Sequence, residues 1–266
     1  MKLNRPTTDC CNICGIVKPL SEDHVPPKFW NNHKAKRFSL AFGTLDPEQA
    51  KNSFPYKANN GIAYRSICSE CNSKLGGSYD KELQIFCDTI AHSIRSKIII
   101  PTISVDIRIN RVARAVAGHF LAAKDFYDDN CLVDVNLRKY LADDSALPPT
   151  GMHLYCYPYL YNAIVVGRDL VPMGKDVPQG MLSLISSFPV SFILTDAIVH
   201  GMTDLFAKCS NDINEKGNVT LFRKAAFIPG TNTLRHYAWP INISENGAFG
   251  VLGGTAIQSL IIATEV

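Results

Sequence analysis

The chain has 266 residues, of which 46% are hydrophobic and 19% charged, and its formal net charge is +3. This length accommodates one large or two modest domains, and the composition excludes a disordered or fibrous chain. The N-terminus lacks the apolar core of a signal peptide, and the apolar run near the other end is short and rich in glycine. We therefore expect a cytoplasmic protein without a membrane partner.

The segment up to Gly77 contains two Cys-x-x-Cys pairs, Cys11 with Cys14 and Cys68 with Cys71. The chain has nine cysteines, an odd number, and no export signal, which argues against a disulfide framework. Two such pairs provide four thiolates for a tetrahedral zinc site, and a segment with little apolar periodicity needs a structural metal to fold. The sequence thus predicts a structural Zn²⁺ at these four cysteines, with four buried free thiols as the alternative.

Regular secondary structure is predicted beyond the Gly-Gly pair. Apolar residues fall on one face of a helix over 79–96, and Ser78 is placed to cap its N-terminus. Alternation over 103–109 predicts a strand, and helical spacing returns over 111–126. From residue 152 onward the apolar runs are β-branched and aromatic and are broken by Pro, Gly and Asn, which predicts strands. Helices followed by strands indicate an α+β fold.

The change in composition near residue 80 predicts two domains. Residues 1–80 form a small zinc-stapled module, and residues 81–266 form a larger domain of helices and then strands that acts in dimerisation, substrate clamping or regulation. The first 80 residues contain 11 Lys and Arg against 7 Asp and Glu. This excess of positive charge suits a nucleic-acid partner, although a solvated basic face explains it equally well. We expect a homodimer through the larger domain.

Two motifs lie between and after the cysteine pairs. The stretch EDHVPPK places Asp23 beside His24, and the second pair opens the stretch CNSKLGGSYD. Together with CNICG around the first pair, these motifs resemble the HNH endonuclease family, of the ββα-metal type. The resemblance covers about the first 80 residues. It implies an N-terminal ββα-metal module that hydrolyses phosphodiester bonds, with a helix beginning at the second cysteine pair.

The resemblance implies a role for individual residues. His24 would be the general base that takes a proton from water, because an imidazole accepts protons near neutral pH. Asp23 and Asn72, the latter at a position where the family often has His, would hold a catalytic Mg²⁺ or Mn²⁺ through oxygen atoms. Asp80 is a further candidate ligand of this ion. Its alternative role is a first-turn residue that interacts with the helix dipole.

The resemblance also implies an asparagine that braces the hairpin loop. That residue is Asn59 or Asn60, of which Asn60 is the candidate carried forward. Basic residues follow the Asp-His pair and are candidate phosphate contacts, with ordinary solvated side chains as the equal alternative. They are Lys28, Lys34, Lys36 and Arg37.

The predicted function is that of a divalent-metal-dependent HNH endonuclease with a structural zinc ion. DNA is favoured over RNA as the substrate, and the family context implies a bacterial or phage defence or mobile-element nuclease. The alternative is a non-catalytic, zinc-stabilised nucleic-acid-binding protein. Asp23, His24 and Asn72 argue against that alternative, because binding alone requires none of the three. A third hypothesis is that the N-terminal zinc module has only a structural role and that the larger domain has an unrelated function, such as binding a small molecule.

Overall fold

The computed structural model describes most of the chain. The described residues are 3–40, 56–96, 101–170, 180–199, 202–222, 225–227, 234–236 and 261–265. Helices and strands are mixed along this part of the chain, which confirms the α+β class. Among the helices of these segments, none combines the length and the apolar character that crossing a membrane requires.

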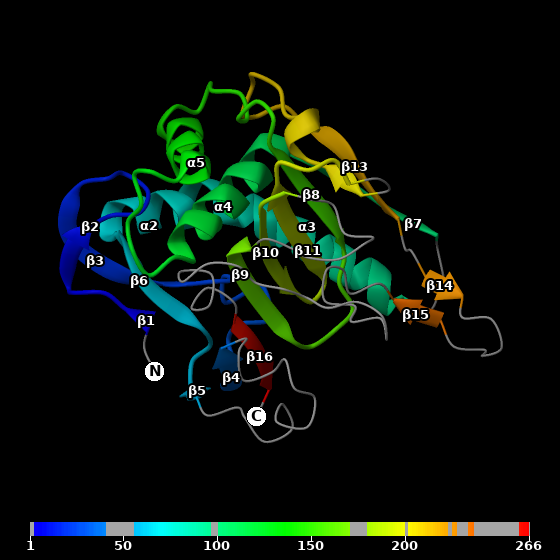
Figure 1. Ribbon diagram of the computed structural model, residues 1–266. Coiled ribbons are helices and arrows are strands. Elements are labelled where there is room, and N and C mark those ends of the chain that lie inside the picture. The colour runs from blue at the N-terminus through cyan, green and yellow to red at the C-terminus, as the bar shows by residue number, and fades with distance from the viewer. Residues whose placement is uncertain are drawn as a thin grey trace.

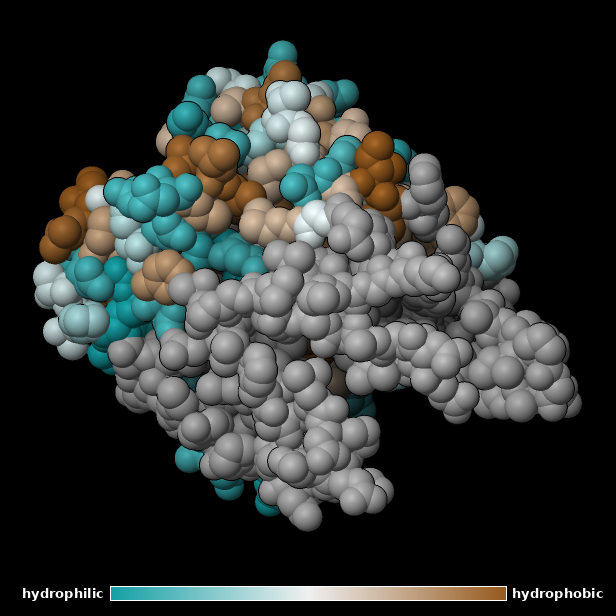
Figure 2. All heavy atoms as spheres, in the orientation of Figure 1, coloured by the Kyte–Doolittle hydropathy of each residue, from teal (hydrophilic) through white to brown (hydrophobic). Residues whose placement is uncertain are grey.

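A four-stranded sheet carries the N-terminal motifs (Figure 1). Its strand order is β1-β6-β3-β2, with β1 parallel to β6 and the other neighbours antiparallel. Figure 2 shows hydrophobic atoms at the turn between β2 and β3, where Ile16 and Val17 are 52% and 67% exposed. The strands are β1 (Leu3–Asn4), β2 (Thr8–Cys10), β3 (Val17–His24) and β6 (Ala63–Cys68).

An eight-stranded sheet has the order β12-β8-β11-β10-β9-β16-β4-β5. Its strands β4 and β5 precede residue 80 in the chain, whereas the other six follow residue 150. The predicted boundary after residue 80 therefore does not separate the two sheets. The strands are β4 (Lys36–Leu40), β5 (Tyr56–Ala58), β8 (His153–Pro158), β9 (Ile164–Leu170), β10 (Leu182–Ser187), β11 (Val190–Thr195), β12 (Thr203–Asp204) and β16 (Ile261–Glu265).

Two further antiparallel pairs complete the strands of the described segments. One joins β7 (Thr102–Ile107) to β13 (Gly217–Phe222), and the other joins β14 (Ala225–Phe227) to β15 (Leu234–His236). The strand expected over 103–109 is thus present as β7. Several strands expected after residue 150 are present as well, while the whole stretch 237–260 lies outside the described residues.

Helices α2 (Ser69–Lys74), η2 (Leu75–Tyr79) and α3 (Asp80–Arg95) follow one another without a break. The helix expected over 79–96 is therefore present, but the expected cap at Ser78 is wrong, because Ser78 lies inside the π-helical turn η2. The helix expected over 111–126 is present as α4 (Ile109–Ala122). The other helices of the described segments are α5 (Leu132–Ala142) and the short 3₁₀ helix η3 (Phe206–Lys208).

One hydrophobic core connects the small sheet, the helices and the large sheet. Helices α3 and α4 pass along one face of the large sheet (Figure 1). The Phe192 ring on β11 contacts Trp30 and Phe86, with ring centroids 5.3 and 6.2 Å apart. The indole N–H of Trp30, which follows the Asp-His motif, donates a hydrogen bond to the Ser187 carbonyl at 3.0 Å. The N-terminal motifs are therefore packed directly against the larger part of the fold.

Candidate functional site

The four cysteines of the two pairs meet at one point. Cys11 and Cys14 lie in the turn between β2 and β3, while Cys68 ends β6 and Cys71 lies in α2. Their sulfur atoms all lie within 4.8 Å of one another, and those of Cys14 and Cys68 are 3.9 Å apart. A tetrahedral zinc site with bonds of about 2.3 Å separates its sulfurs by about 3.8 Å. The cluster therefore fits a metal ion such as zinc.

Local hydrogen bonds favour a thiolate in this cluster. A hydrogen bond from the Cys71 thiol, together with bonds from backbone N–H groups, lowers the pKa of Cys11 although burial opposes the shift, and the same hydrogen bond raises the pKa of Cys71. One of these donors is the backbone N–H of Cys68, whose nitrogen lies 3.2 Å from the Cys11 sulfur. Because thiolates rather than thiols bind zinc, this environment prepares Cys11 for a metal ion.

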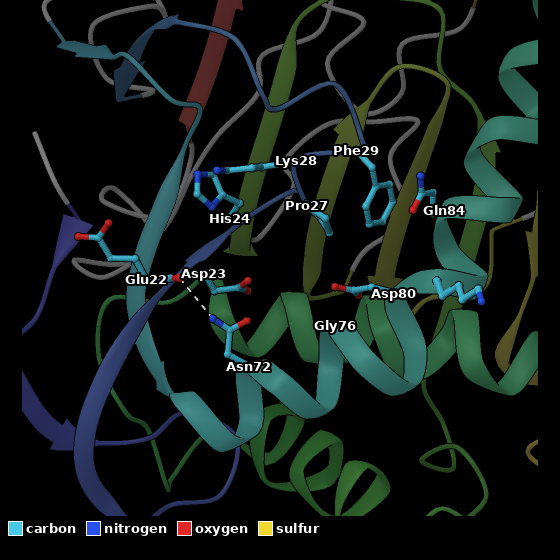
Figure 3. A pocket seen from close by; sticks show the side chains of 11 residues that line it. Glu22, Asp23, His24, Pro27, Lys28, Phe29, Asn72, Gly76, Asp80 and Gln84 are labelled. Carbon is cyan, nitrogen blue, oxygen red and sulfur yellow. Dashed lines mark hydrogen bonds between the residues drawn. The ribbon is translucent and has the colours of Figure 1, made fainter.

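A cavity of about 370 Å³ lies between β3, the loop that follows it, and the α2–α3 helical run (Figure 3). Carboxylate, imidazole, amide and ammonium groups share this cavity. Figure 3 shows the carboxylates of Asp23 and Asp80 pointing toward each other from β3 and α3. The lining residues are Glu22, Asp23, His24, Pro27, Lys28, Phe29, Asn72, Gly76, Asp80, Lys81 and Gln84. The structure thus brings the predicted Asp23, His24, Asn72 and Asp80 together.

A bulge in the small sheet lies just before Asp23 and His24. Ser21 pairs with Ile67 and Glu22 with Arg65, so the register shifts and β6 contains one extra residue. Bulges increase the local twist of a strand pair and are common beside functional sites. In an untwisted strand neighbouring side chains point to opposite faces. Here Asp23 and His24, at the end of β3, line the same cavity.

The His24 ring is held by a backbone carbonyl. Its Nε2 atom lies 2.8 Å from the carbonyl oxygen of Asn60. Since a carbonyl only accepts, Nε2 carries the hydrogen and the Nδ1 lone pair is left to accept a proton. Burial lowers the pKa of His24, which keeps the ring neutral at neutral pH. This is the protonation state that a general base requires.

The side chain that braces the loop before β6 is Asn32. Its amide nitrogen donates to the carbonyls of Pro26 and Ile62 at 2.6 and 2.9 Å, and its amide oxygen accepts from the Ile62 N–H at 2.8 Å. Asn32 is fully buried, whereas Asn59 and Asn60 are exposed. Asn60 contributes its backbone carbonyl to His24, so the predicted bracing by its side chain is replaced by that of Asn32.

Asn72 lies on α2 immediately after Cys71. Its amide nitrogen donates to the Ser21 hydroxyl at 3.2 Å and to the Glu22 carbonyl at 3.3 Å. Both contacts require the NH₂ group to face β3 (Figure 3). The amide oxygen is then free of these contacts and can serve as a hard ligand beside Asp23.

His119 on α4 joins the cavity's two aspartates and was not predicted as a site residue. Its Nδ1 atom lies 3.2 Å from Asp23 Oδ2, and its Nε2 atom lies 2.9 Å from Asp80 Oδ1. Burial opposes a charge on the ring, but the two carboxylates prevail and raise the pKa of His119 to about 10. In the sequence His119 lies on an apolar helix with no neighbouring polar partner, which is the pattern of a structural histidine. Only the fold reveals its partners.

The predicted phosphate contacts are not all available on the surface. Lys28 is exposed and lines the cavity, and Lys34 and Arg37 are exposed elsewhere. Lys36, on β4, is fully buried, which removes it from the predicted set. Lys81 on α3 lines the cavity and is exposed, although the sequence pattern did not single it out. The cavity rim therefore has ammonium groups from two separate elements.

No family model, curated protein or solved structure matches this chain. The oxygen-rich cavity and the cluster of four cysteines are joined through α2, where Asn72 follows Cys71 directly. A metal at the cysteines would thus fix the position of a residue that lines the cavity.

A second acidic cluster forms ion pairs with lysine and arginine side chains of the protein. Cys131, Asp134 and Asp169 have ligand atoms within 4.8 Å of one another. The Lys124 ammonium lies 2.9 Å from Asp134 and 2.8 Å from Asp169, and Arg168 forms ion pairs with both carboxylates. The two buried cations satisfy these carboxylates, so the cluster is an ion-pair network rather than a metal site.

Proposed function

We propose that this protein is a metal-dependent endonuclease of the HNH type that hydrolyses phosphodiester bonds of DNA. The observation that supports this most strongly is the cavity shared by Asp23, His24, Asn72 and Asp80. Such a set of two carboxylates, an amide and a neutral imidazole is what hydrolysis with a hard cation requires. A binding protein has no need for this combination.

Asp23, Asp80 and Asn72 would hold the cation, because Mg²⁺ and Mn²⁺ prefer carboxylate and amide oxygens. The bound cation would supply positive charge to the scissile phosphate and to the departing oxygen. The zinc ion proposed at the four cysteines has a separate role, since soft thiolates in a closed site hold a structural ion. It fastens the β2–β3 turn to α2.

His24 would take the proton of the attacking water at Nδ1, while the Asn60 carbonyl keeps its Nε2 atom protonated and the ring oriented. General-base catalysis of this kind typically contributes about 10² to 10⁴ in rate. Lys28 and Lys81 at the rim would bind the phosphates on either side of the scissile bond. DNA is the proposed substrate.

Cleavage of supercoiled plasmid tests the proposal. Zinc-loaded protein is incubated with plasmid in the presence or absence of Mg²⁺ or Mn²⁺. Omission of the ion is preferable to EDTA alone, because a chelator also extracts zinc. His24→Ala is compared with His92→Ala, a matched control at an exposed histidine of α3 that does not line the cavity. Single- and double-stranded RNA are assayed in parallel.

We expect metal-dependent cleavage that His24→Ala reduces by about 10² or more and His92→Ala leaves unchanged. Undiminished cleavage by His24→Ala contradicts the assigned base. Retarded migration of DNA without cleavage at any metal concentration supports the non-catalytic binding protein instead. Faster cleavage of RNA than of DNA would show that RNA, and not DNA, is the preferred substrate.

A further inference from the structure

His119 lies behind the two carboxylates that face the cavity. It is on α4, its side chain is 1% exposed, and its two ring nitrogens contact Asp23 and Asp80. Nδ1 lies 3.2 Å from Asp23 Oδ2 and Nε2 lies 2.9 Å from Asp80 Oδ1. A single buried ring thereby contacts two carboxyl groups that come from β3 and α3.

Each aspartate uses one of its oxygens for this contact, Oδ2 in Asp23 and Oδ1 in Asp80. The other oxygen of each carboxylate is left for a ligand in the cavity. The imidazole ring lies between the two contacting oxygens, so it determines how the two carboxylates are placed relative to each other.

The position of His119 is fixed by contacts at the end of α4. Asn12, next to Cys11, donates from its amide to the carbonyls of Leu121 and Lys124 at 3.0 and 2.8 Å. Ser66, the extra residue of the bulge in β6, donates to the carbonyl of Ala122 at 2.6 Å. The last carbonyls of a helix have no partner within the helix, so these side chains cap α4. The cysteine module thus anchors α4 where His119 lies.

Gly118 allows α4 to approach the helical run that carries Asp80. A Cβ atom at this position would lie 2.3 Å from Leu75 Cδ2, closer than side-chain atoms pack. Leu75 begins η2, the turn that leads directly into Asp80. The absence of a side chain at residue 118 therefore lets the next residue, His119, reach the Asp80 carboxylate.

We infer that His119 is a positioning residue of the proposed nuclease, which orients the Asp23 and Asp80 carboxylates toward the cavity in which a divalent cation would bind. The inference rests on the proposed function and adds α4 to the catalytic centre. Groups that orient metal ligands typically contribute about 10- to 100-fold to metal affinity. His119 does not contact the cation or the substrate.

Three substitutions separate the two contacts. His119→Ala removes both. His119→Asn places an amide nitrogen near the position of Nδ1 and keeps the Asp23 contact, whereas His119→Gln places one near Nε2 and keeps the Asp80 contact. The matched control is His153→Gln, because His153 also forms a His-Asp pair, with Asp204 at 2.7 Å, but does not line the cavity.

Mn²⁺ binding to the zinc-loaded protein is measured by electron paramagnetic resonance, together with the melting temperature and the Mn²⁺ dependence of plasmid cleavage. We expect His119→Ala to weaken Mn²⁺ binding about 10- to 100-fold. The Asn and Gln variants should each lose less. His153→Gln should bind Mn²⁺ as the wild type does. At saturating Mn²⁺ the variants should recover most of their cleavage rate.

Wild-type Mn²⁺ affinity in the Asn and Gln variants overturns the inference, and it does so even if His119→Ala fails to fold. If the wild type binds Mn²⁺ and the His119 variants bind it more weakly, but the wild type cuts no nucleic acid, the positioning role is upheld and the nuclease proposal is refuted. A wild-type protein that neither binds Mn²⁺ nor cuts nucleic acid refutes both. The binding measurement thus distinguishes the two failures.

Discussion

Replacing Asn32 with alanine should destabilise the protein strongly. The substitution removes three hydrogen bonds of a fully buried amide, two to the backbone of Ile62 just before β6 and one to the carbonyl of Pro26 just after β3. Each bond is worth about 1 kcal/mol net, and a buried N–H or carbonyl left without a partner costs about 1 to 3 kcal/mol. We therefore expect a loss of about 3 to 5 kcal/mol, because Pro26 and Ile62, whose backbone groups lose these partners, are buried.

The loop's backbone offers no way to relax. Gly61 has φ +78°, and a Cβ atom there would lie 2.0 Å from the Asn32 carbonyl oxygen. The two segments are therefore in direct backbone contact, and Asn32 is the side chain that joins them. Since the neighbouring Asn60 carbonyl orients His24, the same substitution should also reduce any activity that depends on His24.

Thermal unfolding of zinc-loaded protein measures the effect. For a domain of this size about 1 kcal/mol corresponds to about 2 to 4 °C, so Asn32→Ala should lower the melting temperature by roughly 6 to 20 °C. Asn59→Ala and Asn60→Ala are matched controls in the loop that Asn32 braces, and both side chains are exposed. Each should change stability by less than about 0.5 kcal/mol. A change of under 2 °C for Asn32→Ala, or an equal change for Asn59→Ala, would refute the reasoning.

Three other predictions concern the metal, the ion-pair network and the cavity rim. Cys71→Ser should lose bound zinc and lower the melting temperature, whereas Cys131→Ser, outside the thiolate cluster, should keep its zinc; elemental analysis and calorimetry decide this. Burial raises the pKa of Asp169, but Arg168 and Lys124 outweigh it and hold that pKa below its ordinary value of 3.8. At pH values above the pKa of Asp169 in the unfolded chain, the ionised carboxylate therefore stabilises the fold. This stabilisation is lost as the pH falls through the pKa of Asp169 in the folded protein. Asp169→Asn should therefore lower the free energy of unfolding at pH 7 by about 1 to 3 kcal/mol. The free energy of unfolding of the variant, measured by urea titration, should also fall less steeply between about pH 5 and 2, and an unchanged pH profile would contradict this. Lys28→Ala should weaken DNA binding and lower the salt dependence by about one counterion, measured by fluorescence anisotropy, and an unchanged slope would remove Lys28 from the phosphate contacts.

The sequence predicts those features that depend on local spacing. The Cys-x-x-Cys pairs place two sulfurs in one turn each, and the structure brings all four together. The helices over 79–96 and 111–126 follow from apolar periodicity, and both are present. Helix α5 was not anticipated, because few of its residues are buried and its apolar pattern is weak.

Features that depend on distant contacts could not be predicted. The partners of His119 lie 96 and 39 residues earlier in the chain, and no local pattern connects them. Asn32 was overlooked in favour of two asparagines beside a glycine, because only the fold shows which side chain is buried against the loop backbone. The burial of Lys36 could not be predicted for the same reason, because its strand β4 pairs with β16 at the far end of the chain.

The capping of α4 has a consequence for synthesis of the protein. Asn12 donates to the carbonyl of Leu121, 109 residues later, so a nascent chain that ends before α4 lacks the partner of its own cysteine module. Cys71 precedes His119 by 48 residues, which corresponds to roughly 2 to 10 s at about 5 to 20 residues per second. During that interval both cysteine pairs have been synthesised and can meet around a metal ion such as zinc, whereas Asp23 does not yet have His119 as a partner. Metal loading can therefore precede completion of the cavity on the ribosome.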